Sequence, residues 1–504
     1  MARFYLTTAI DYANGDPHLG HALEKLGADV IARWRRLRGD DVRFLMGMDE
    51  HAQSVVQAAA AGGITPQAWV DRMAATFAGF WERLAISRDD WIRTTEPRHA
   101  RAVTTLLSRI RERRPDHVFL AEYEGLYCTG CEEFKQESQI VDGRCGEHPS
   151  LTLVPTREEN YYFRLSAYRD EMLTRIASDA FRVRPEIRRN EVLGLLRAGL
   201  QDISISRRRQ PWGIPFPGDP DHTVYVWFDA LINYLSATGY PDPGYQRLWP
   251  ADLHIVGKGI TRFHCVIWPA MLLSAGVALP REVWAHGYVQ WEGTKMSKSA
   301  GTAVTLGEAI DRHGPDALRY FLLREVGFEA DGNFTWDRFD ERYTADLADG
   351  LGNLVSRSLA MLAKYRDGVV PAAAEETPLD VAGREVVVAY ATAMDSLDLR
   401  GGAEAAWGLV ATANLYIQQV APWALAKSGR DEELDGALAA LGRALYRLAV
   451  LTAPFIPGKA QLLWQSLGAP PEALATAWGG LERPLAAGLA TAKPEVLFPK
   501  PASV

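Results

Sequence analysis

The alternation of apolar and polar positions near the N-terminus predicts a strand, a turn and a helix in succession. Residues 4–10 alternate and are rich in strand-forming side chains, and a polar turn with a proline at residues 14–17 ends them. Apolar residues then recur with a helical period over residues 19–34, and Gly39 marks the end of the helix. A second apolar run at residues 42–48 leads into another helix, which completes a β-α-β unit. Such units favour a parallel sheet, whose ligands bind at the carboxyl ends of the strands.

The same α/β pattern returns in the middle of the chain after an interruption. Residues 223–230 and 253–257 are interpreted as buried strands, residues 263–279 as a buried helix, and residues 283–291 as a further strand. The interruption is rich in turn residues and short mixed strands, which is typical of a domain inserted between two halves of one sheet. From residue 332 onward, alanine- and leucine-rich segments without a convincing strand predict a helical bundle.

The predicted fold class is therefore α/β, with a Rossmann-like parallel-sheet domain that is split by an insert and followed by an α-helical bundle. The expected boundaries are residues 1–112 for the first half of the sheet domain, 113–220 for the insert, 221–331 for the second half and 332–504 for the bundle.

Length and composition agree with a soluble protein of several domains. The 504 residues suggest about three or four domains, and the hydrophobic (47%) and charged (23%) fractions exclude collagen-like, disordered and disulfide-scaffold classes. Residues 1–16 lack the layout of a secretory signal, and residues 263–279 are too short and too interrupted to span a membrane, so a cytoplasmic location is expected. The net charge of −8 repels polyanions, so any contact with nucleic acid must be local. The three arginines at residues 207–209 offer one such basic patch.

Two polar motifs lie where predicted strands end. His18, Gly20 and His21 stand at the start of the first helix, where backbone N–H groups, a missing side chain and two imidazoles favour an anion. A small loop after the last strand of the α/β region carries Lys295 and Lys298, and mobile ammonium groups suit a triphosphate. Each motif has an ordinary alternative, because paired histidines are often a packing detail and a lysine-rich turn is often only solvated. Their joint occurrence on one split sheet favours the functional interpretation.

Cysteine spacing predicts a metal site inside the insert. Cys128 and Cys131 form a CxxC pair, and Cys145 and His148 form a CxxH pair shortly after it. This array has the spacing of a tetrahedral zinc knuckle, and a cytosolic chain has little other reason to keep three neighbouring thiols. Because all four ligands come from protein, the site is closed and structural. Cys265, the fourth cysteine, lies in the apolar helix and is expected in the core.

One helix of the predicted bundle has a polar pair opposite its apolar face. Asn353 and Arg357 are four residues apart and should face outward, and Trp423 follows Pro422 further along the chain. Asn and Arg side chains can bind the edges of splayed bases, and a Trp can stack on them, but solvated polar residues and a core Trp are the ordinary alternative. The apolar face itself is defined by residues that recur every four positions: Tyr343, Leu347, Leu351, Val355 and Leu359.

The histidine and lysine motifs together resemble the HIGH and KMSKS motifs of class I aminoacyl-tRNA synthetases. Within that class the chain most closely resembles the methionyl-tRNA synthetase family of the single zinc-knuckle type, over essentially its whole length. The segments that carry the closer resemblance are residues 9–15, 48–51, 225–230 and 286–288. The resemblance implies ATP-dependent ligation of L-methionine to initiator and elongator methionine tRNAs through methionyl-adenylate, with release of AMP and pyrophosphate. It also implies that Mg²⁺ accompanies ATP and that one structural Zn²⁺ shapes the insert.

The resemblance assigns roles to individual residues as well. A methionine pocket has to be apolar and shaped by aromatic rings, because the thioether sulfur is polarizable and only a weak hydrogen-bond acceptor. Since the chain ends soon after the bundle, a monomer is expected. The implied catalytic residues are His18, His21, Lys295 and Lys298, and Gly20 and Gly257 join these four in binding ATP. The implied methionine-binding residues are Ala9, Ile10, Tyr12, Asp49, Trp227, Ala230, Tyr234, Ile260 and His264, and the implied anticodon-binding residues are Asn353, Arg357 and Trp423.

The chain departs from the family pattern at two positions. Ala52 stands where the family usually has Gly, and Gly259 stands where an Asp commonly supports nucleotide binding. The loss of a hydrogen bond to a charged group costs about 1 to 3 kcal/mol, so weaker ATP binding is expected. One alternative is therefore a divergent, non-catalytic copy that binds RNA or regulates. Another is a class I synthetase for a different apolar amino acid, although the insert is small for an editing domain.

Overall fold

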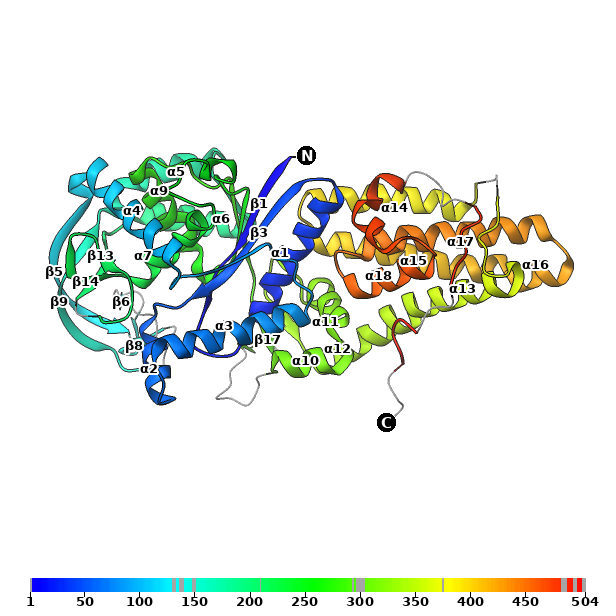
Figure 1. The fold of residues 1–504 in the computed structure, drawn as a ribbon, viewed down its shortest axis with the longest axis horizontal. Helices are drawn as coiled ribbons and strands as arrows, with labels where there is room; N and C mark the ends of the chain where they lie inside the picture. The colour runs from blue at the N-terminus through cyan, green and yellow to red at the C-terminus, as the bar shows by residue number, and fades with distance from the viewer. Residues whose placement is uncertain are drawn as a thin grey trace.

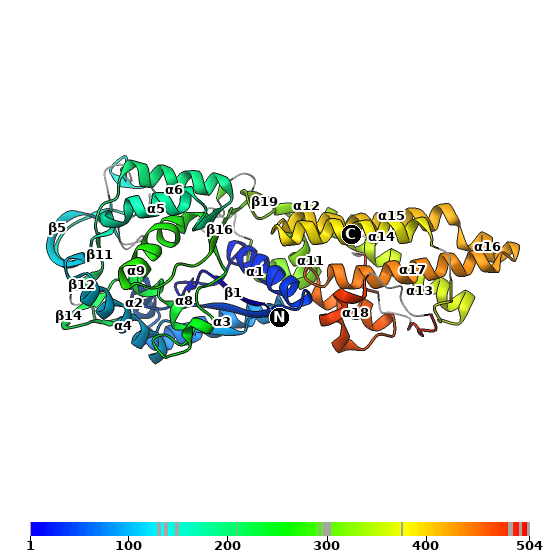
Figure 2. The same cartoon turned by 90° about the horizontal axis from the view of Figure 1, so that it is seen from above.

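The molecule is elongated, with an α/β part at one end and a helical bundle at the other (Figure 1). A computed structural model describes residues 2–128, 133–135, 140–146, 151–208, 210–291, 294–295, 304–373, 376–481, 487–492 and 496–500. The view from above gives the same arrangement, with the bundle extending away from the sheet (Figure 2). In the described part of the chain, no helix is long and apolar enough to cross a membrane.

A parallel sheet forms the centre of the α/β part. Its strands run in the order β10-β16-β15-β1-β3-β2, β4 also pairs with β3, and every adjacent pair is parallel. This confirms the predicted fold class and the split of the sheet by an intervening segment. The strands are β1 (Arg3–Thr8), β2 (Asp11–Tyr12), β3 (Asp41–Asp49), β4 (Asp90–Arg93), β10 (Arg182–Arg184), β15 (Leu253–Gly257) and β16 (Glu282–His286).

Helices connect the strands of the first half as the apolar pattern predicts. Helix α1 (Leu19–Leu37) follows β1 and β2 and buries its apolar face against the sheet, and its first turn carries the histidine motif. Because α1 begins immediately after the carboxyl end of β1 and β2, its free N–H groups face the edge of the sheet where ligands bind. The other helices of this half are α2 (Gln53–Ala61), α3 (Pro66–Arg83) and α4 (Pro97–Arg113).

The intervening segment folds mainly as small antiparallel sheets. One sheet has the order β11-β9-β5-β6, a second has the order β12-β14-β13, and β7 pairs with β8. The segment also supplies β10, which joins the edge of the parallel sheet by pairing with β16. Its elements are η1 (Pro115–His117), β5 (Val118–Cys128), β6 (Glu133–Lys135), β7 (Ile140–Val141), β8 (Arg144–Cys145), β9 (Val154–Phe163), η3 (Leu165–Tyr168), α5 (Arg169–Ala177), α6 (Glu186–Ala198), β11 (Ile203–Ser204), β12 (Ser206–Arg208), β13 (Pro215–Phe216) and β14 (Asp219–Val224).

The prediction of a surface basic patch at residues 207–209 is wrong for Arg207, while Arg209 lies outside the described residues. The Arg207 side chain is buried, and its guanidinium lies 4.2 Å from the ring centre of Tyr225. It also donates to Ser204 Oγ (2.9 Å) and to the carbonyl of Ser206 (2.8 Å). The guanidinium is thus used inside the insert and does not face a phosphate backbone.

Two predicted strands of the second half have different structures. The strand predicted at residues 223–230 ends at Val224, and helix α7 (Val226–Ala230) begins two residues later. The strand predicted at residues 283–291 is broken at Gly287, where a Cβ would overlap the backbone carbonyl of Ala330. Short apolar runs do not distinguish strand from buried helix, so these errors follow from the pattern itself.

The remaining elements of the second half complete the sheet domain. The predicted helix at residues 263–279 is confirmed as a π-helical turn, η6 (Phe263–Ile267), that continues into α9 (Trp268–Ala275), with Cys265 buried as expected. The other elements are α8 (Asn233–Ser236), η4 (Tyr245–Arg247), η5 (Lys258–Ile260), β17 (Val289–Trp291), β18 (Thr294–Lys295), α10 (Leu306–His313), α11 (Pro315–Phe321) and η7 (Leu322–Val326).

Long antiparallel helices form the bundle, and the predicted apolar stripe from Tyr343 to Leu359 is buried throughout. The expectation of no strand after residue 332 is wrong by one short element, because β19 (Gly332–Phe334) pairs with β17. The helical elements are α12 (Trp336–Arg342), η8 (Tyr343–Gly352), α13 (Asn353–Arg366), α14 (Pro378–Asp395), α15 (Leu399–Val420), α16 (Pro422–Ser428), α17 (Asp431–Thr452), α18 (Pro457–Ser466) and η9 (Pro471–Gly480).

Candidate active site

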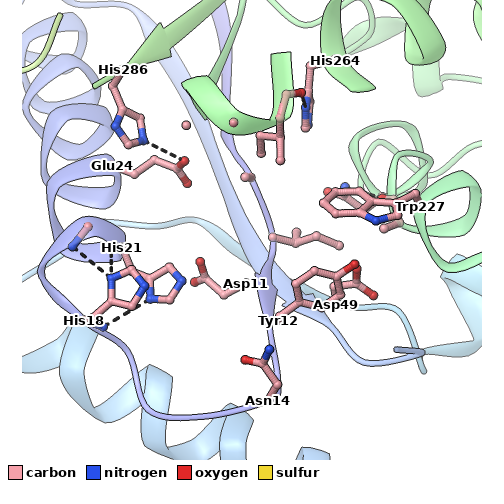
Figure 3. A pocket seen from close by; sticks show the side chains of 18 of the residues that line it. Asp11, Tyr12, Asn14, His18, His21, Glu24, Asp49, Trp227, His264 and His286 are labelled. Atoms are coloured by element: carbon pink, nitrogen blue, oxygen red, sulfur yellow. Dashed lines mark hydrogen bonds and ion pairs between the residues drawn. The ribbon is translucent and has the colours of Figure 1, made fainter. Parts of the chain in front are cut away.

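A cavity of about 660 Å³ opens at the carboxyl edge of β1, β3 and β15 (Figure 3). Strand β1 lies in the middle of the sheet, with β3 on one side and β15 on the other, so the strand order reverses there. Ligands of open parallel sheets bind at the carboxyl ends of the strands where the order reverses. The cavity wall includes all nine residues predicted to bind methionine, and also His18, Gly20, His21 and Gly257. The family resemblance named these residues in separate segments of the chain, and the fold places them around one space.

The histidine motif forms the first turn of α1. His18 is the N-cap residue, and its Nδ1 accepts hydrogen bonds from the backbone N–H groups of Gly20 (3.1 Å) and His21 (3.3 Å). His21 Nδ1 in turn accepts from the His18 N–H (3.3 Å), and the two rings stack with their centres 3.8 Å apart. Each neutral imidazole therefore carries its proton on Nε2, which is a hydrogen-bond donor for an anionic oxygen. Burial lowers the pKa of His21 well below its usual value, and the nearby His18 adds to the effect.

Carboxylates and one lysine form a buried cluster on the same side of the cavity. Lys25 Nζ donates to Asp11 Oδ1 (2.8 Å) and to Glu24 Oε1 (2.6 Å), and His286 Nε2 lies 3.1 Å from Glu24 Oε2. Burial raises the pKa of Asp11 to about 6, although Lys25 opposes that shift. Sequence reasoning missed the roles of Asp11, Glu24 and His286 as lining residues. Signals were present, because Glu24 is a buried charged residue of α1 three positions after His21, and Asp11 and His286 lie in segments that carry the family resemblance.

The opposite side of the cavity is aromatic, and Figure 3 shows Trp227 and Tyr12 there beside Asp49. The Trp227 ring stacks on Phe263 at 4.0 Å between centres and meets Tyr12 edge to face at 5.4 Å. The buried Asp49 carboxylate, at the end of β3, is the acidic group on this side. This side therefore combines an apolar surface with one negative charge.

A hydrogen-bond chain fixes the polar groups behind the aromatic wall. His264 Nδ1 donates to the carbonyl of Ile260 (3.0 Å), so its Nε2 accepts from the Tyr234 hydroxyl (2.7 Å). Burial lowers the pKa of His264 to about 4, so its imidazole is neutral at neutral pH. Tyr234 and His264 consequently present fixed, uncharged surfaces to the cavity.

The Asp229 carboxylate joins the two segments that carry Asp49 and Trp227. Its oxygens lie 2.6 Å from His51 Nδ1 and 2.6 Å from His99 Nε2, and all three side chains are buried. The two histidines hold the pKa of Asp229 below its usual value even though burial acts in the opposite direction. Because His51 follows Asp49 by two residues and Asp229 follows Trp227 by two, this carboxylate sets the spacing between the acidic and aromatic groups.

The lysine motif lies at the edge of the described structure. Lys295 forms the end of β18, which pairs with β17, but its side chain and all of Lys298 lie outside the described residues. The backbone that follows the loop returns to the histidine motif, because Thr305 forms an antiparallel bridge with His18. The described residue that follows the lysine loop, Thr305, therefore lies next to the histidine motif in space.

The predicted zinc ligands are only partly described. Cys128 ends β5, Cys145 ends β8, and both are buried in a small apolar cluster with Leu153. Cys131 and His148 lie outside the described residues, and the described part contains no group of three potential ligands. The two described thiols share one cluster, which fits the predicted knuckle.

The predicted anticodon-binding residues share a surface near the far tip of the bundle. Asn353, the first residue of α13, is exposed, and the Arg357 guanidinium lies one turn further along, 6.0 Å from the Trp423 ring centre. The Trp423 side chain is 47% exposed, so it is not a core residue. Helix α16, which carries Trp423, lies at the end of the molecule opposite the α/β part (Figure 1).

Comparison with family profiles agrees with this geometry. A profile described as tRNA synthetases class I (M) matches residues 4–152 and 150–359, and one described as the anticodon binding domain of methionyl tRNA ligase matches residues 368–503. The split parallel sheet, the paired motifs and these matches define a class I tRNA synthetase.

Individual relatives narrow the assignment. Proteins named methionine–tRNA ligase from Streptomyces coelicolor and Mesorhizobium japonicum are 40% and 43% identical to the chain, cover 99% of it, and are themselves covered over 96% and 98% of their lengths. The Mycobacterium tuberculosis methionyl-tRNA synthetase in complex with methionyl-adenylate matches with a TM-score of 0.94 at 39% identity, covering 99% of this chain and 100% of that one. Its apo form matches with a TM-score of 0.86 at 37% identity, covering 100% and 99%. The chain belongs to the methionyl-tRNA synthetase family.

Proposed function

We propose that this chain joins L-methionine to its tRNA in two steps that share the cavity described above. The observation that carries the proposal is the union, in one space, of an anion-binding helix start at His18 and His21, the buried Asp49 and an aromatic wall. These groups match three parts of methionyl-adenylate: its phosphate, its ammonium group and its thioether side chain. The alternatives of a non-catalytic copy and of another apolar amino acid are not favoured, because these groups are all present and the relatives are methionine–tRNA ligases.

In the first step, a methionine carboxylate oxygen attacks the α-phosphorus of ATP, and pyrophosphate leaves with the electrons of the broken P–O bond. Catalysis of such a step consists mostly of positioning and of stabilising the charge on the phosphate oxygens. The Nε2–H groups of His18 and His21 and the N–H groups of the first turn of α1 supply donors on one side. Lys295 and Lys298 supply positive charge from the neighbouring loop, and Mg²⁺ enters bound to ATP.

Methionine is held by one charge and by shape. The Asp49 carboxylate binds its ammonium group, and Tyr12, Trp227 and Tyr234 enclose the thioether. His264, being neutral, does not impose a charge on the sulfur. The remaining contacts come from the small and apolar residues Ala9, Ile10, Ala230 and Ile260.

In the second step, a hydroxyl of the terminal tRNA ribose attacks the acyl carbon of the adenylate, and AMP leaves. The tRNA must reach from this cavity to the far tip of the bundle, where Asn353, Arg357 and Trp423 bind the anticodon of initiator and elongator tRNAs. One structural Zn²⁺, held by Cys128, Cys131, Cys145 and His148, stabilises the insert. A monomer contains all of these sites.

Methionine-dependent exchange of pyrophosphate into ATP, measured without tRNA, tests the first step directly. We expect exchange with methionine to exceed exchange with leucine, isoleucine or valine in kcat/KM, since the pocket is shaped for a thioether. Lys298→Ala should slow the exchange by orders of magnitude, whereas the matched control Lys364→Ala, on the exposed face of α13, should not. Wild-type protein that catalyses no exchange, or that prefers another amino acid, would refute the proposal.

A further inference from the structure

Tyr288 lies between β16 and β17 and forms part of the cavity wall. Its backbone N–H donates to Asp331 Oδ1 (2.9 Å), and Lys258 Nζ lies 4.6 Å from its ring centre. Lys258 Nζ also donates to Asp331 Oδ2 (2.6 Å). The Asp331 carboxylate therefore binds both the backbone of Tyr288 and the lysine that lies over its ring. Tyr288 is 39% exposed, and the Lys258 ammonium group lies over its ring.

The hydroxyl of Tyr288 occupies space that only glycine leaves open. A Cβ on Gly259 would overlap the Tyr288 hydroxyl oxygen, and a Cβ on Gly257 would touch the ring at 4.0 Å. Both glycines lie at the carboxyl end of β15 and line the cavity. The Tyr288 phenol therefore fits against the cavity wall only because residue 259 has no side chain.

This part of the wall faces the place left for a nucleoside. Phosphate oxygens belong at the start of α1, and the amino acid belongs beside Asp49 and Trp227 on the aromatic side. Figure 3 shows Glu24 and His286 across the cavity from Trp227, and Gly257 lies against His286, where a Cβ would come within 3.7 Å of its Nε2. A nucleotide bound to a parallel sheet extends across the carboxyl ends of the strands where the strand order reverses, which here is between β1 and β15. We therefore expect the ribose at the carboxyl end of β15.

We propose that the Tyr288 hydroxyl binds a ribose hydroxyl of ATP and of the adenylate, in the space that Gly259 leaves open. A neutral phenol can both donate and accept, as can a ribose hydroxyl, so the two form a hydrogen bond in either direction. The contact compensates for the side chain that position 259 lacks. This assignment rests on the proposed function, because it presumes that ATP is a substrate.

Tyr288→Phe tests the contact by removing only the oxygen atom. In pyrophosphate exchange, KM for ATP should rise about 2- to 10-fold, the range for one neutral hydrogen bond, while KM for methionine stays unchanged. Wild-type protein should also prefer ATP over 2′-deoxy-ATP or 3′-deoxy-ATP, and the variant should lose that preference for one of the two analogues. Tyr365→Phe, on α13, is the matched control and should change none of these values.

Gly259→Ala provides an independent test, because its methyl group must displace the phenol. Its KM for ATP should rise to a similar degree, and the double variant Gly259→Ala/Tyr288→Phe should be no worse than either single variant. Additive losses, an unchanged KM for ATP in Tyr288→Phe, or a change confined to methionine would overturn the inference. Those outcomes, measured against an active wild type, leave the proposed function standing, whereas an inactive wild type would refute the function itself.

Discussion

Arg319 joins the sheet domain to the bundle, and its replacement by Met is the most informative test of how the two parts are held. The side chain is fully buried on α11, at the junction in Figure 1. Its guanidinium donates to Asp29 Oδ2 on α1 (2.7 Å) and to the carbonyl of Leu84 (2.8 Å) in the sheet domain. It also donates to the carbonyls of Pro454 (2.7 Å) and Phe455 (2.9 Å) between α17 and α18.

The expected loss of folding stability follows from the buried groups that lose their partner in Arg319→Met. Methionine fills similar volume, but Asp29 stays buried and charged, and three carbonyls lose their donor. Removal of one partner from a buried ion pair costs about 3–5 kcal/mol. Asp29 retains Arg33 Nε (2.8 Å) and the backbone N–H of Ser87 (2.7 Å), so the low end of the range applies. A loss of about 3 kcal/mol raises the equilibrium constant for unfolding by roughly two orders of magnitude.

Urea unfolding monitored by fluorescence, together with both activity assays, measures the effect. We expect a lower midpoint and a bundle that unfolds separately from the sheet domain, with aminoacylation reduced more than pyrophosphate exchange. The matched control is Arg338→Ala, whose partners Glu325 and Glu341 lie in a surface network and whose side chain is 47% exposed, so its cost should stay within about 1 kcal/mol. Adding Asp29→Asn to Arg319→Met should recover part of the loss, because the uncompensated charge is gone. If Arg319→Met unfolds at the wild-type midpoint, the reasoning about this junction is wrong.

Three further predictions concern the bundle, the insert and pH. Trp423→Ala should lower aminoacylation kcat/KM by roughly 5- to 150-fold and spare exchange without tRNA, and equal damage to both would show a structural role instead. Elemental analysis should find about one zinc per chain in protein purified without chelator, and a value near zero contradicts the Cys128, Cys131, Cys145 and His148 assignment. Arg33 and Arg319 lower the pKa of the buried Asp29 to about 2 although burial opposes them, so its stabilisation of about 2–3 kcal/mol is present above pH 4 and is lost as pH falls toward 2. Asp29→Asn should flatten the pH dependence of unfolding in that range, and an unchanged profile would contradict the shift.

The sequence determined the local elements and the chemistry of the motifs. The helical period after residue 18 and the apolar run at residues 42–48 correspond to α1 and β3, because each has one strongly buried face. The stripe from Tyr343 to Leu359 is buried for the same reason. The family resemblance also named the residues of the cavity wall, since it depends on short, contiguous motifs.

Whether a short apolar run forms a strand or a helix was decided only by its tertiary surroundings. Residues 226–230 form a helix whose Trp227 and Ala230 belong to the cavity wall, and the Ala330 backbone lies against Gly287, where the predicted strand breaks. Arg207 is buried over Tyr225, which its run of arginines in the sequence did not indicate. In each case the contacts that stabilise the observed conformation come from groups that are distant in sequence, and a local sequence pattern does not contain those groups.

Long-range contacts likewise decided how the motifs work together. The bridge between His18 and Thr305, the bond between His286 and Glu24 and the ion pair between Arg319 and Asp29 each join residues more than 250 positions apart. No periodicity relates such pairs, because their proximity depends on the order of strands in the sheet. The sequence by itself therefore supplied the reacting groups, and the parallel sheet decided which of them share a cavity, since it brings the carboxyl ends of β1, β3 and β15 to one edge.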